Sequence, residues 1–459
     1  MNDTMENVSA VILAAGDGKR MGSESSKVLC HVLFRPMLEW VLQNCTGAGV
    51  EKICVVVGKG AGDVEAAVGG RAAIAMQAER RGTGHAVSCA ADFLREATDG
   101  DTLILFGDAP FQFPHVIEGA YQQHKRQGNA MTVVSAKVDD PFGYGRIVRD
   151  GSGVCAIVEQ KDANDAEAAI REINAGACWY QTGRLLEALA ELTPANAQGE
   201  LYLTDTLRIL RKKGCRVNAY VAGDPRVVLG ANTRKQLHAL NEIAREMVFE
   251  ELWEKGVDIP VTDGIIISRE AVIGRDTRIL PGTIIKGSTV VGERCLLGPN
   301  SMLDDAVLGD DCQIKASWVT RSVLQNDVQI GPFSQVRPNC AIASGVRIGD
   351  FVELKNSVVG QNTHASHLTY IGDTDCGARV NFGCGVVTVN YNGKDKNRTA
   401  IGDDCFVGCN TNLVAPVTLG KGAYTAAGST VTVDVPSDAL CIARAREVIK
   451  EGRATNYHK

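Results

Sequence analysis

Residues 271–303, AVIGRDTRILPGTIIKGSTVVGERCLLGPNSML, decide the fold of the second half of the chain. An apolar residue returns at every sixth position of this stretch, and glycine follows many of these residues. Two further runs, at 330–354 and 401–419, keep the same period. A period of six fits neither an α-helix nor an alternating strand. It predicts a parallel β-helix of hexapeptide repeats, with the apolar residues pointing into a narrow prism.

Between residues 355 and 400 the six-residue period is lost, and the segment carries His, Asn, Tyr and Lys. Inserted segments of repeat proteins lie on the surface and often carry function. This segment is therefore where we expect the functional residues of the β-helix.

The first half of the chain alternates short apolar runs, at 10–13, 53–57, 102–106 and 131–135, with helix-like segments such as 37–45 and 115–126. Strands separated by helices predict βαβ units and a mostly parallel sheet, that is, a Rossmann-like α/β domain.

One continuous helical pattern then separates the two halves of the chain. It begins at a capping-box sequence, Thr233 to Gln236, and ends at Gly256. The expected organisation is an α/β domain over 1–231, a linker helix over 232–255 and a β-helix domain over 256–459.

Composition excludes several function classes. The chain has 459 residues, a formal net charge of −6, 45% hydrophobic and 22% charged residues. A weakly acidic protein of this kind has no electrostatic reason to bind nucleic acid or an anionic membrane. The apolar run 11–15 is too short for a signal sequence or a membrane span. The odd number of cysteines, 15, without a CxxC pair predicts reduced thiols and a cytoplasmic protein.

A glycine-rich turn, Leu13-Ala-Ala-Gly-Asp-Gly-Lys-Arg-Met21, directly follows the first predicted strand. Gly16 and Gly18 would let backbone N–H groups approach an anion closely, and Lys19, Arg20 and Lys27 would add positive charge. A dinucleotide fingerprint would require glycine where Met21 stands, and a P-loop would require Ser or Thr where Arg20 stands. The turn fits neither, so by itself it is either a triphosphate site or an ordinary turn.

Two further residues are candidates for chemistry. Asp108 follows an apolar strand at the carboxyl end of the sheet, where α/β domains bind ligands, so it is either a ligand of a hard cation or a loop residue. His364 and His367 lie three residues apart without further ligands at a metal-motif spacing, which argues against zinc. A histidine is suited to removing a proton from an ammonium group near neutral pH.

Motifs in a fixed order connect these features to one family. They are Leu13 to Met21 with Lys27-Val-Leu29, Gln77, Gly82-Thr-Gly-His-Ala86, Phe106-Gly-Asp-Ala-Pro110, Gly143-Tyr-Gly-Arg146, Glu159-Gln-Lys161, Ile173-Asn-Ala-Gly176, Gly199-Glu-Leu-Tyr-Leu-Thr-Asp205, Phe351-Val-Glu-Leu-Lys355 and His367-Leu-Thr-Tyr370. The sequence resembles, over essentially its whole length, the bacterial family of bifunctional N-acetylglucosamine-1-phosphate uridylyltransferases and glucosamine-1-phosphate acetyltransferases.

The resemblance implies two activities. One transfers acetyl from acetyl-CoA to glucosamine 1-phosphate, and the other joins UTP to N-acetylglucosamine 1-phosphate and releases pyrophosphate. It also implies a left-handed β-helix, and Mg²⁺ held by Asp108 and Asn232, with Arg20 and Lys27 as catalytic cations. The residues implied to bind UTP and its product are Leu13, Ala14, Ala15, Gly16, Lys27, Gln77, Gly82, Thr83, Gly145, Glu159, Asn174 and Asn232.

For acetyl transfer, the resemblance makes His367 the general base and assigns the sugar phosphate to Arg337 and Lys355. The other residues implied to bind glucosamine 1-phosphate or acetyl-CoA are Tyr370, Asn381, Asn390, Tyr391, Lys396, Cys409, Ala427 and Arg444. It gives His364 no role and implies a homotrimer. The acidic charge balance predicts no nucleic-acid or membrane partner.

Two positions depart from the family pattern: Ser26 stands where the family has proline, and Cys409 where it usually has serine. Cys409 is expected to change hydrogen bonding, because a thiol is the weaker donor. Two alternatives remain: a pyrophosphorylase whose β-helix only assembles subunits, and a non-catalytic regulatory subunit. His367, Lys355 and Tyr370 argue against the first, and Asp108, Lys27 and the glycine turn argue against the second.

Overall fold

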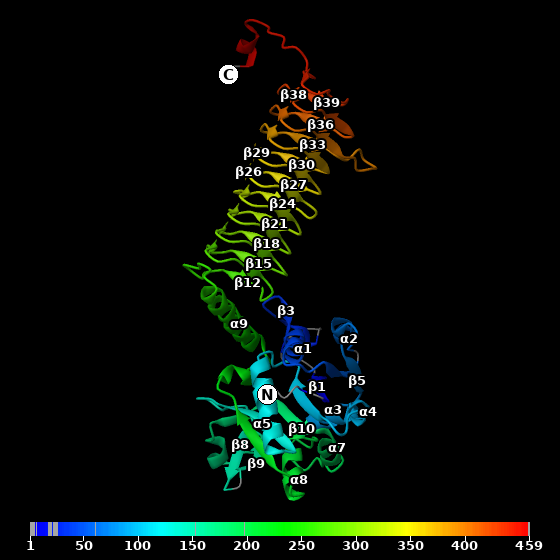
Figure 1. The fold of residues 1–459 in the computed structure, drawn as a ribbon, viewed down its shortest axis with the longest axis vertical. Coiled ribbons are helices and arrows are strands. Elements are labelled where there is room, and N and C mark those ends of the chain that lie inside the picture. Colours follow the sequence, from blue (N-terminus) through cyan, green and yellow to red (C-terminus); the bar gives the residue numbers. More distant parts are fainter. Residues whose placement is uncertain are drawn as a thin grey trace. The chain divides into compact units, whose positions relative to one another are not determined.

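A computed structural model describes residues 5, 7–16, 21, 26–59, 61–151, 153–196 and 198–457 (Figure 1). The chain divides into two compact units, Met1–Ala244 and Arg245–Lys459, and the division falls inside one helix. Among the described helices, none combines the length and the apolar character that crossing a membrane would require.

A twisted sheet forms the centre of the first unit. Its strands lie in the order β11-β7-β10-β6-β1-β4-β5, and β8 and β9 extend it beside β10. Strands β1, β4, β5 and β6 run parallel to one another, β11 is parallel to β7, and β10 lies antiparallel between β6 and β7. The strands of this sheet are β1 (Val8–Ala14), β4 (Lys52–Gly58), β5 (Ala73–Gln77), β6 (Asp101–Phe106), β7 (Met131–Lys137), β8 (Arg146–Asp150), β9 (Gly153–Val158), β10 (Glu172–Gln181) and β11 (Val217–Val221). A separate two-stranded antiparallel sheet consists of β2 (His31–Val32) and β3 (Arg35–Pro36).

Short helices connect these strands. They are α1 (Met37–Gly47), α2 (Gly62–Val68), α3 (Thr83–Cys89), α4 (Ala91–Arg95), α5 (Pro114–Gln127), α6 (Asp165–Ala168), α7 (Thr182–Leu189) and α8 (Thr206–Lys212), with 3-10 turns η2 (Lys27–Leu29), η3 (Leu203–Asp205) and η4 (Pro225–Val228). Every predicted strand and helix of this half is present, within a few residues of its expected bounds, which confirms the Rossmann-like α/β fold. Strands β1 and β4 are almost wholly buried, as expected for apolar strands in the middle of a parallel sheet.

Helix α9 (Arg234–Glu254) follows the sheet. The Thr233 hydroxyl accepts a hydrogen bond from the Gln236 N–H at 3.2 Å, which is one half of the expected capping box. The other half differs, because the Gln236 side chain accepts from the Asn232 N–H at 2.8 Å. The apolar residues Leu240, Ala244 and Val248 of α9 are buried.

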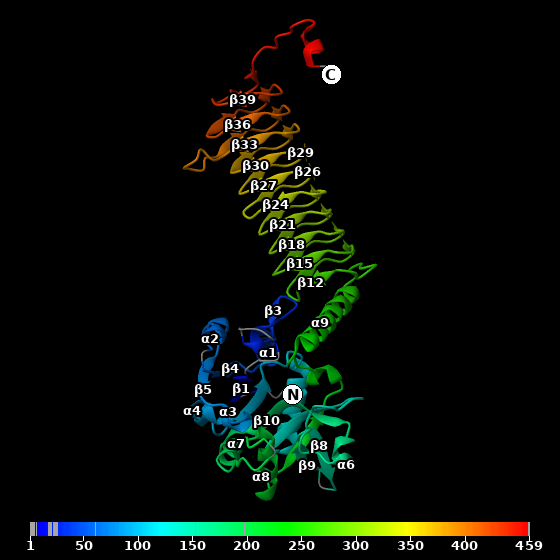
Figure 2. The same cartoon turned by 180° about the vertical axis from the view of Figure 1, so that it is seen from behind.

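The second unit is the β-helix predicted by the six-residue period, seen from opposite sides in Figures 1 and 2. Each coil places strands on three faces of a prism, and equivalent strands of successive coils pair in parallel. The first face consists of β12 (Ile266–Ile267), β15 (Ile284–Lys286), β18 (Met302–Asp304), β21 (Trp318–Thr320), β24 (Gln335–Val336), β27 (Glu353–Lys355), β30 (Tyr370–Gly372), β33 (Val387–Val389), β36 (Asn412–Val414) and β39 (Thr430–Val431).

The other two faces are built in the same way. The second face consists of β13 (Val272–Ile273), β16 (Val290–Val291), β19 (Val307–Leu308), β22 (Val323–Leu324), β25 (Ala341–Ile342), β28 (Val358–Val359), β31 (Thr374–Cys376), β34 (Thr399–Ile401) and β37 (Val417–Leu419). The third face consists of β14 (Arg278–Ile279), β17 (Leu296–Leu297), β20 (Gln313–Ile314), β23 (Gln329–Ile330), β26 (Arg347–Asp350), β29 (His364–His367), β32 (Asn381–Phe382), β35 (Phe406–Val407), β38 (Tyr424–Thr425) and β40 (Leu440–Cys441). The 3-10 turn η5 (Arg453–Tyr457) follows.

The expectation that 355–400 interrupts the β-helix is wrong for most of that segment. Strands β28 to β33 continue the coils, and their inward residues Ala365, Ile371, Cys376, Phe382 and Thr388 are buried. The pattern is hard to recognise in the sequence because small and polar residues fill inward positions and some steps shorten from six residues to five. Only residues 390–398 leave the prism, as a loop between β33 and β34 that is closed by a bridge between Tyr391 and Lys396.

Candidate functional site

Lys27, Asp108 and Asn232 converge at one point of the first unit, although they lie far apart in the sequence. The Lys27 ammonium donates to the Asp108 carboxylate and, at 2.9 Å, to the side-chain oxygen of Asn232. These three side chains meet at the carboxyl end of β6, because Asp108 follows that strand by two residues. A carboxylate and an amide oxygen that focus on one cation are the donor set that a hard metal ion prefers.

Backbone contacts fix this geometry. The Ala231 N–H donates to the Asp108 carbonyl at 3.2 Å, which ties the segment before α9 to the end of β6. Gly230 allows this approach, since a Cβ at that position would stand 2.9 Å from the same carbonyl. A side chain at Gly230 would therefore force a shift in the segment that positions Asn232.

The close approach of Gly82 to a backbone carbonyl positions the turn before α3. Gly82 has φ +105°, and a Cβ there would lie 2.5 Å from the Leu201 carbonyl. That carbonyl accepts from the Gly84 N–H at 2.8 Å, and the Thr83 hydroxyl accepts from the Leu203 N–H at 3.0 Å. The glycine-threonine turn and the segment 199–205, two motifs of the sequence, are thus bound to each other.

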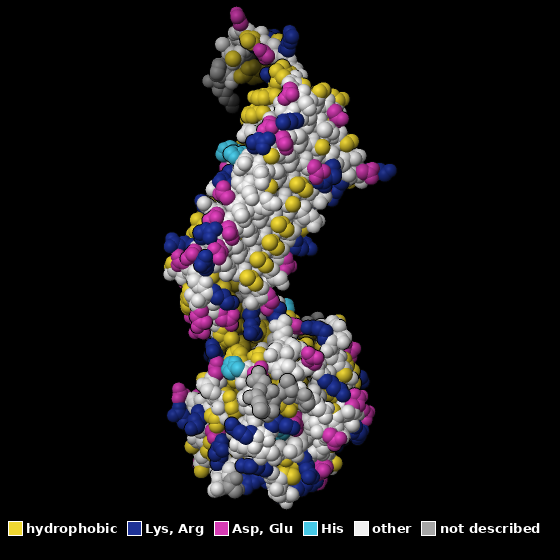
Figure 3. All heavy atoms as spheres, viewed as in Figure 1, with side chains coloured by type: hydrophobic (Ala, Val, Ile, Leu, Met, Phe, Trp, Pro, Cys, Tyr) yellow, Lys and Arg dark blue, Asp and Glu magenta, His cyan; other side chains and the backbone are white. Residues whose placement is uncertain are grey.

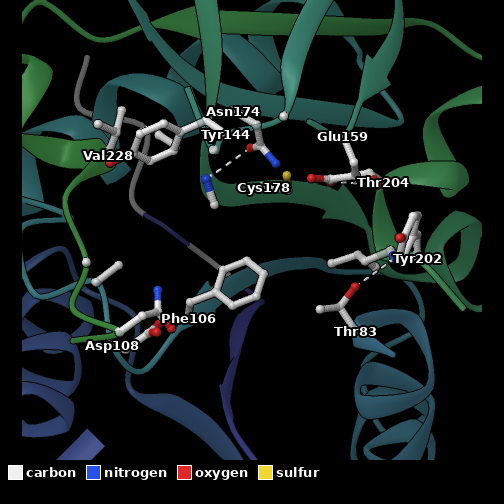
Figure 4. A pocket seen from close by; sticks show the side chains of 18 of the residues that line it. Thr83, Phe106, Asp108, Tyr144, Glu159, Asn174, Cys178, Tyr202, Thr204 and Val228 are labelled. Atoms are coloured by element: carbon white, nitrogen blue, oxygen red, sulfur yellow. Dashed lines mark hydrogen bonds between the residues drawn. The ribbon is translucent and has the colours of Figure 1, made fainter. Parts of the chain in front are cut away.

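A cavity of about 590 Å³ lies above the sheet, between β6, β10 and these loops (Figure 4). Thr83, Gly145, Glu159, Asn174 and Asn232 line it, together with Lys27 and Asp108. A second cavity, of about 270 Å³, adjoins it through Lys27, Thr83, Phe106, Asp108 and Glu200. Of the predicted residues, Leu13, Ala15, Gly16, Gln77 and Gly82 line this second cavity. Lys27 and Asp108 therefore line both cavities.

Glu159 and Asn174 bring polar atoms to the wall opposite Asp108 in Figure 4. Burial raises the pKa of Glu159, and the carboxylates of Asp162 and Asp205 add to this effect. The Thr204 hydroxyl donates to Glu159 at 3.3 Å, and Asn174 accepts from the Gly176 N–H at 3.0 Å. Such acceptors can hydrogen-bond the hydroxyl and amide groups of a sugar.

Of the predicted residues of this half, Ala14 is buried at the end of β1 without lining either cavity. Arg20 lies outside the described residues. Sequence reasoning missed Cys178, Tyr180 and Val228, which do line the larger cavity. Cys178 and Tyr180 alternate along β10, beyond the motif Ile173 to Gly176, which covers only the first part of that strand. Ser26, the first departure from the family pattern, has φ −57°, a value that proline would also adopt.

On the first face of the β-helix, basic side chains collect over adjacent coils. Arg337 and Lys355 occupy equivalent positions of successive coils, and Arg337 donates to Glu353 at 2.8 Å. Lys396, from the loop at 390–398, lies against Lys355. The nearby ammonium lowers the pKa of Lys355, because two like charges disfavour ionisation of each other. A dianionic phosphate would relieve this repulsion.

Polar side chains frame this basic cluster. The Asn390 amide donates to the Tyr370 hydroxyl at 3.4 Å and to the Asp373 carboxylate at 2.5 Å, and Asn356 donates to the other oxygen of Asp373. Burial opposes ionisation of Asp373, but these donors outweigh it and hold its pKa below the usual range. Sequence reasoning missed Glu353 and Asp373, whose charges balance the lysines.

His367 lies at the corner between the third and the first face. Its Nδ1 is 2.7 Å from the Asp350 carboxylate, which comes from the equivalent position one coil earlier. This hydrogen bond lowers the pKa of Asp350, so the carboxylate stays ionised. Because Asp350 engages Nδ1, the Nε2 atom is left as the ring nitrogen that can accept a proton. Asp350 is a third residue that sequence reasoning missed in this unit, after Glu353 and Asp373.

The remaining predicted residues of this unit lie at different places on the β-helix. Cys409 and Ala427 occupy the same corner as His367 on later coils, and Arg444 passes within 3.6 Å of where a Cβ on Gly428 would stand. Asn381 instead lies on the third face, in register with His364, so one chain does not bring it to the basic cluster. Tyr391 is exposed in the loop at 390–398 and donates to the Gly393 carbonyl at 2.7 Å. Within the described residues, no three His, Cys, Asp or Glu side chains form a metal-binding group.

Comparison with known families assigns both units. Residues 10–204 match the MobA-like NTP transferase domain family. In the β-helix, residues 296–382 match the GlmU-like C-terminal hexapeptide family, 270–305 the bacterial transferase hexapeptide family and 398–433 the hexapeptide repeat of succinyl-transferase.

Similar proteins match nearly the whole chain. A protein named Bifunctional protein GlmU from Geobacillus sp. strain WCH70 is 48% identical over 443 residues, which is 96% of each chain. Proteins of the same name from Acetivibrio thermocellus and Caldanaerobacter subterraneus subsp. tengcongensis are 46% and 47% identical, over 97% and 98% of each chain.

Proposed function

The chain belongs to the family of bifunctional GlmU proteins, and from that premise we propose which of its residues carry each activity. It is a nucleotidyltransferase and an acetyltransferase: it transfers acetyl from acetyl-CoA to glucosamine 1-phosphate, and uridylyl from UTP to N-acetylglucosamine 1-phosphate. We assign uridylyl transfer to residues 1–231 and acetyl transfer to 256–459, with 232–255 as the linker helix. The observation that carries the assignment is the presence of two separate clusters, at Lys27 and at His367.

Uridylyl transfer is assigned to the Lys27, Asp108 and Asn232 cluster. The sugar 1-phosphate oxygen attacks the α-phosphorus of UTP and pyrophosphate leaves, so the protein needs to position phosphates and neutralise their charge rather than supply a base. The two oxygens that now bind the Lys27 ammonium fit Mg²⁺, which would neutralise phosphate charge when bound. Lys27, already at the junction of the two cavities, would contact the phosphates.

The larger cavity is assigned to the sugar and the smaller one to the nucleotide. Glu159 and Asn174 would accept hydrogen bonds from the N-acetylglucosamine moiety. Leu13, Ala15, Gly16, Gln77 and Gly82 would surround the UTP moiety. The 2.8 Å contact between Gly84 and Leu201 supports this assignment, since it holds the nucleotide side of the site beside the sugar side.

Acetyl transfer is assigned to His367 with Asp350. Nε2 would take a proton from the ammonium of glucosamine 1-phosphate, and the amine would then attack the carbonyl carbon of acetyl-CoA, with the CoA thiolate as leaving group. Asp350 would hold Nδ1–H and so keep Nε2 basic. Arg337, Lys355 and Lys396 would bind the sugar phosphate, and Tyr370 and Asn390 would orient the ring.

For the assembled enzyme we propose a homotrimer, as the family resemblance implies. The outward residues of the second face supply apolar surface for association, because Val272, Val290, Val307, Val323 and Val358 are all exposed. Hydrophobic side chains form a row along the stacked coils in Figure 3. An exposed apolar row of this kind is typical of a surface that another protein chain covers.

Paired assays on the purified full chain test the assignments: pyrophosphate release for uridylyl transfer and CoA release for acetyl transfer. Asp108→Asn should lower pyrophosphate release by about 100-fold or more, since it removes a charged metal ligand, and leave CoA release unchanged. His367→Ala should lower CoA release by about 100- to 10,000-fold, as expected for loss of a general base, and leave pyrophosphate release unchanged. If either variant of folded protein abolished both activities, the assignment to separate sites would be wrong.

A further inference from the structure

Four reactive side chains stand in one column at the corner that carries His367. Asp350 pairs in register with His367, and the pairing of β29 with β32 and of β32 with β35 carries the same column on to Cys384 and Cys409. The Asn410 N–H donates to the Cys384 carbonyl at 2.8 Å, which confirms that the two cysteines lie on adjacent coils. The proposed acetyl transfer uses His367 and Asp350 but has no use for a pair of thiols.

The spacing of the column suits a disulfide. Neighbouring strands of a sheet lie about 4.8 Å apart, and a disulfide bridges Cα atoms that are about 4.4–6.8 Å apart. Outward side chains in register on this β-helix do reach one another. Asp350 and His367 form their hydrogen bond across one step, and the rings of Phe406 and Tyr424 stack across another with centroids 4.5 Å apart.

The exposure of Cys409, together with its register with Cys384, distinguishes this pair from the other cysteines. All fifteen cysteines lie in the described residues, and Cys409 is the exposed one, while Cys384 is half-buried. Cys295 and Cys312 are also in register on adjacent coils, but both are buried and their thiols donate to the Gly309 and Gln325 carbonyls at 3.3 and 3.1 Å. Oxidation of thiols follows access, so the pair at Cys384 and Cys409 is the reactive one.

We propose that Cys384 and Cys409 form a reversible disulfide with a hydroperoxide as the oxidant, and that this disulfide blocks acetyl transfer. The Cys409 thiolate attacks one oxygen of hydrogen peroxide, the O–O bond breaks, and a sulfenic acid and water form. The Cys384 thiol then attacks the Cys409 sulfur, the S–O bond breaks and a second water leaves. Two thiols lose two electrons and two protons, and one peroxide becomes two waters.

The consequence for activity rests on the proposed role of the corner at His367. The disulfide would consume the Cys409 thiol and fix the outer side chains of two coils directly beside the general base. The Lys27 cluster belongs to the other unit, and Cys178, which lines the larger cavity there, is buried. Oxidation should therefore stop CoA release and spare pyrophosphate release.

Peptide mapping of the full chain tests the bond itself. Trypsin separates Cys384, in residues 380–394, from Cys409, in residues 399–421. After treatment with hydrogen peroxide and blocking of free thiols, we expect these two peptides to appear cross-linked, with two hydrogens lost and with fragment ions that place the bond at Cys409 rather than Cys405. Cys295 and Cys312 share the peptide 295–315 and serve as the matched control, which should stay reduced.

Activity is measured on the same samples, with CoA determined by chromatography. CoA release should fall by about tenfold or more as the cross-link forms, as expected when a preorganised site is obstructed, and recover with dithiothreitol. In Cys384→Ser and Cys409→Ser the cross-linked peptide should be absent. Each variant is compared with its own activity before oxidation.

Absence of the cross-link in peroxide-treated protein would overturn the proposal, as would a complete cross-link that leaves CoA release intact. Failure of the proposed function looks different. In that case the reduced protein would release no CoA from acetyl-CoA and glucosamine 1-phosphate, whatever the state of the two cysteines.

Discussion

Among single residues, Asp350 is the one whose part in acetyl transfer can be separated from substrate binding. It contacts His367 and belongs to a different column from the basic cluster at Lys355. Asp350→Asn keeps the shape of the side chain but lets the amide donate to Nδ1, which favours the wrong tautomer of the ring. We expect kcat for acetyl transfer to fall by about tenfold or more, with KM for both substrates unchanged.

A double variant separates positioning from a structural effect. If Asp350 acts only through His367, then adding Asp350→Asn to His367→Ala should cause no further loss, because coupled residues are not additive. Asp350→Glu should recover part of kcat. A further loss in the double variant, or an equal loss of pyrophosphate release, would contradict the role.

Glu159 should make the stability of the first unit depend on pH. Its pKa is raised in the folded protein, so the folded state binds this proton more tightly than the unfolded state. Stability should therefore rise as pH falls from neutral through the raised pKa, and the burial of the ionised form should be unfavourable above it. Glu159→Gln removes this contribution, so the variant should unfold at a higher temperature than the wild type at pH 8.

The comparison at pH 5 supplies the control for Glu159. There a larger fraction of the wild-type carboxyl is protonated than at pH 8, so the difference in apparent melting temperature between the two proteins should shrink. Pyrophosphate release by Glu159→Gln should also fall at pH 8, because Glu159 is proposed to bind the sugar. An unchanged difference in melting temperature between pH 5 and pH 8 would contradict the shifted pKa.

The sequence predicts some residues of the two candidate sites and not others. The family motifs anticipate Lys27, Asp108 and His367, because each stands in a short continuous segment. The sequence does not identify Asp350 and Asp373, because their hydrogen-bond partners come from neighbouring coils. A single repeat does not reveal how the coils of a β-helix are in register.

Among the elements, the turn before α3 depends most strictly on one residue. Gly82 combines φ +105° with a Cβ position 2.5 Å from a backbone carbonyl. Gly82→Ala should destabilise the first unit by about 1–3 kcal/mol through strain and should raise KM for UTP, because the turn lines the nucleotide cavity. Thermal unfolding and pyrophosphate release at varied UTP measure the two effects.

Gly62 provides the matched control for this turn. It begins α2, has no atoms within 4 Å of a Cβ and has no left-handed backbone angle, so Gly62→Ala should leave KM unchanged and stability equal or slightly higher. If Gly82→Ala behaved like Gly62→Ala, the close approach to Leu201 would not determine the nucleotide site.

Periodicity predicts elements well where one residue type fills equivalent positions. The strands of the sheet are recognised as apolar runs because both of their faces are buried. The β-helix is recognised wherever its inward residues are Ile, Leu or Val. At Ala365, Cys376 and Thr388 the same positions hold small or polar residues, and there the period misleads although the coils continue.

On the scale of the whole molecule, the two units show why one chain can catalyse two reactions. Each unit has its own buried interior and its own cluster of charged residues. The α/β unit places its ligands at strand ends, whereas the β-helix places its reactive residues in columns across coils. Neither type of site needs a hydrogen bond from the other, so variants at Asp108 and His367 are expected to act independently.

Assembly is the remaining prediction at this scale. The full chain should sediment with three times the chain mass of 48.9 kDa. Val290→Asp combined with Val307→Asp places two charges in the apolar row of the second face, and burying unpaired charges is strongly unfavourable, so this variant should sediment with the mass of one chain. Val433→Asp, at a position that is 71% exposed and outside the row, is the control and should remain trimeric. A double variant that keeps the trimer mass would show that the valine row lies outside the interface, and a wild-type protein that sediments as one chain would refute the trimer itself.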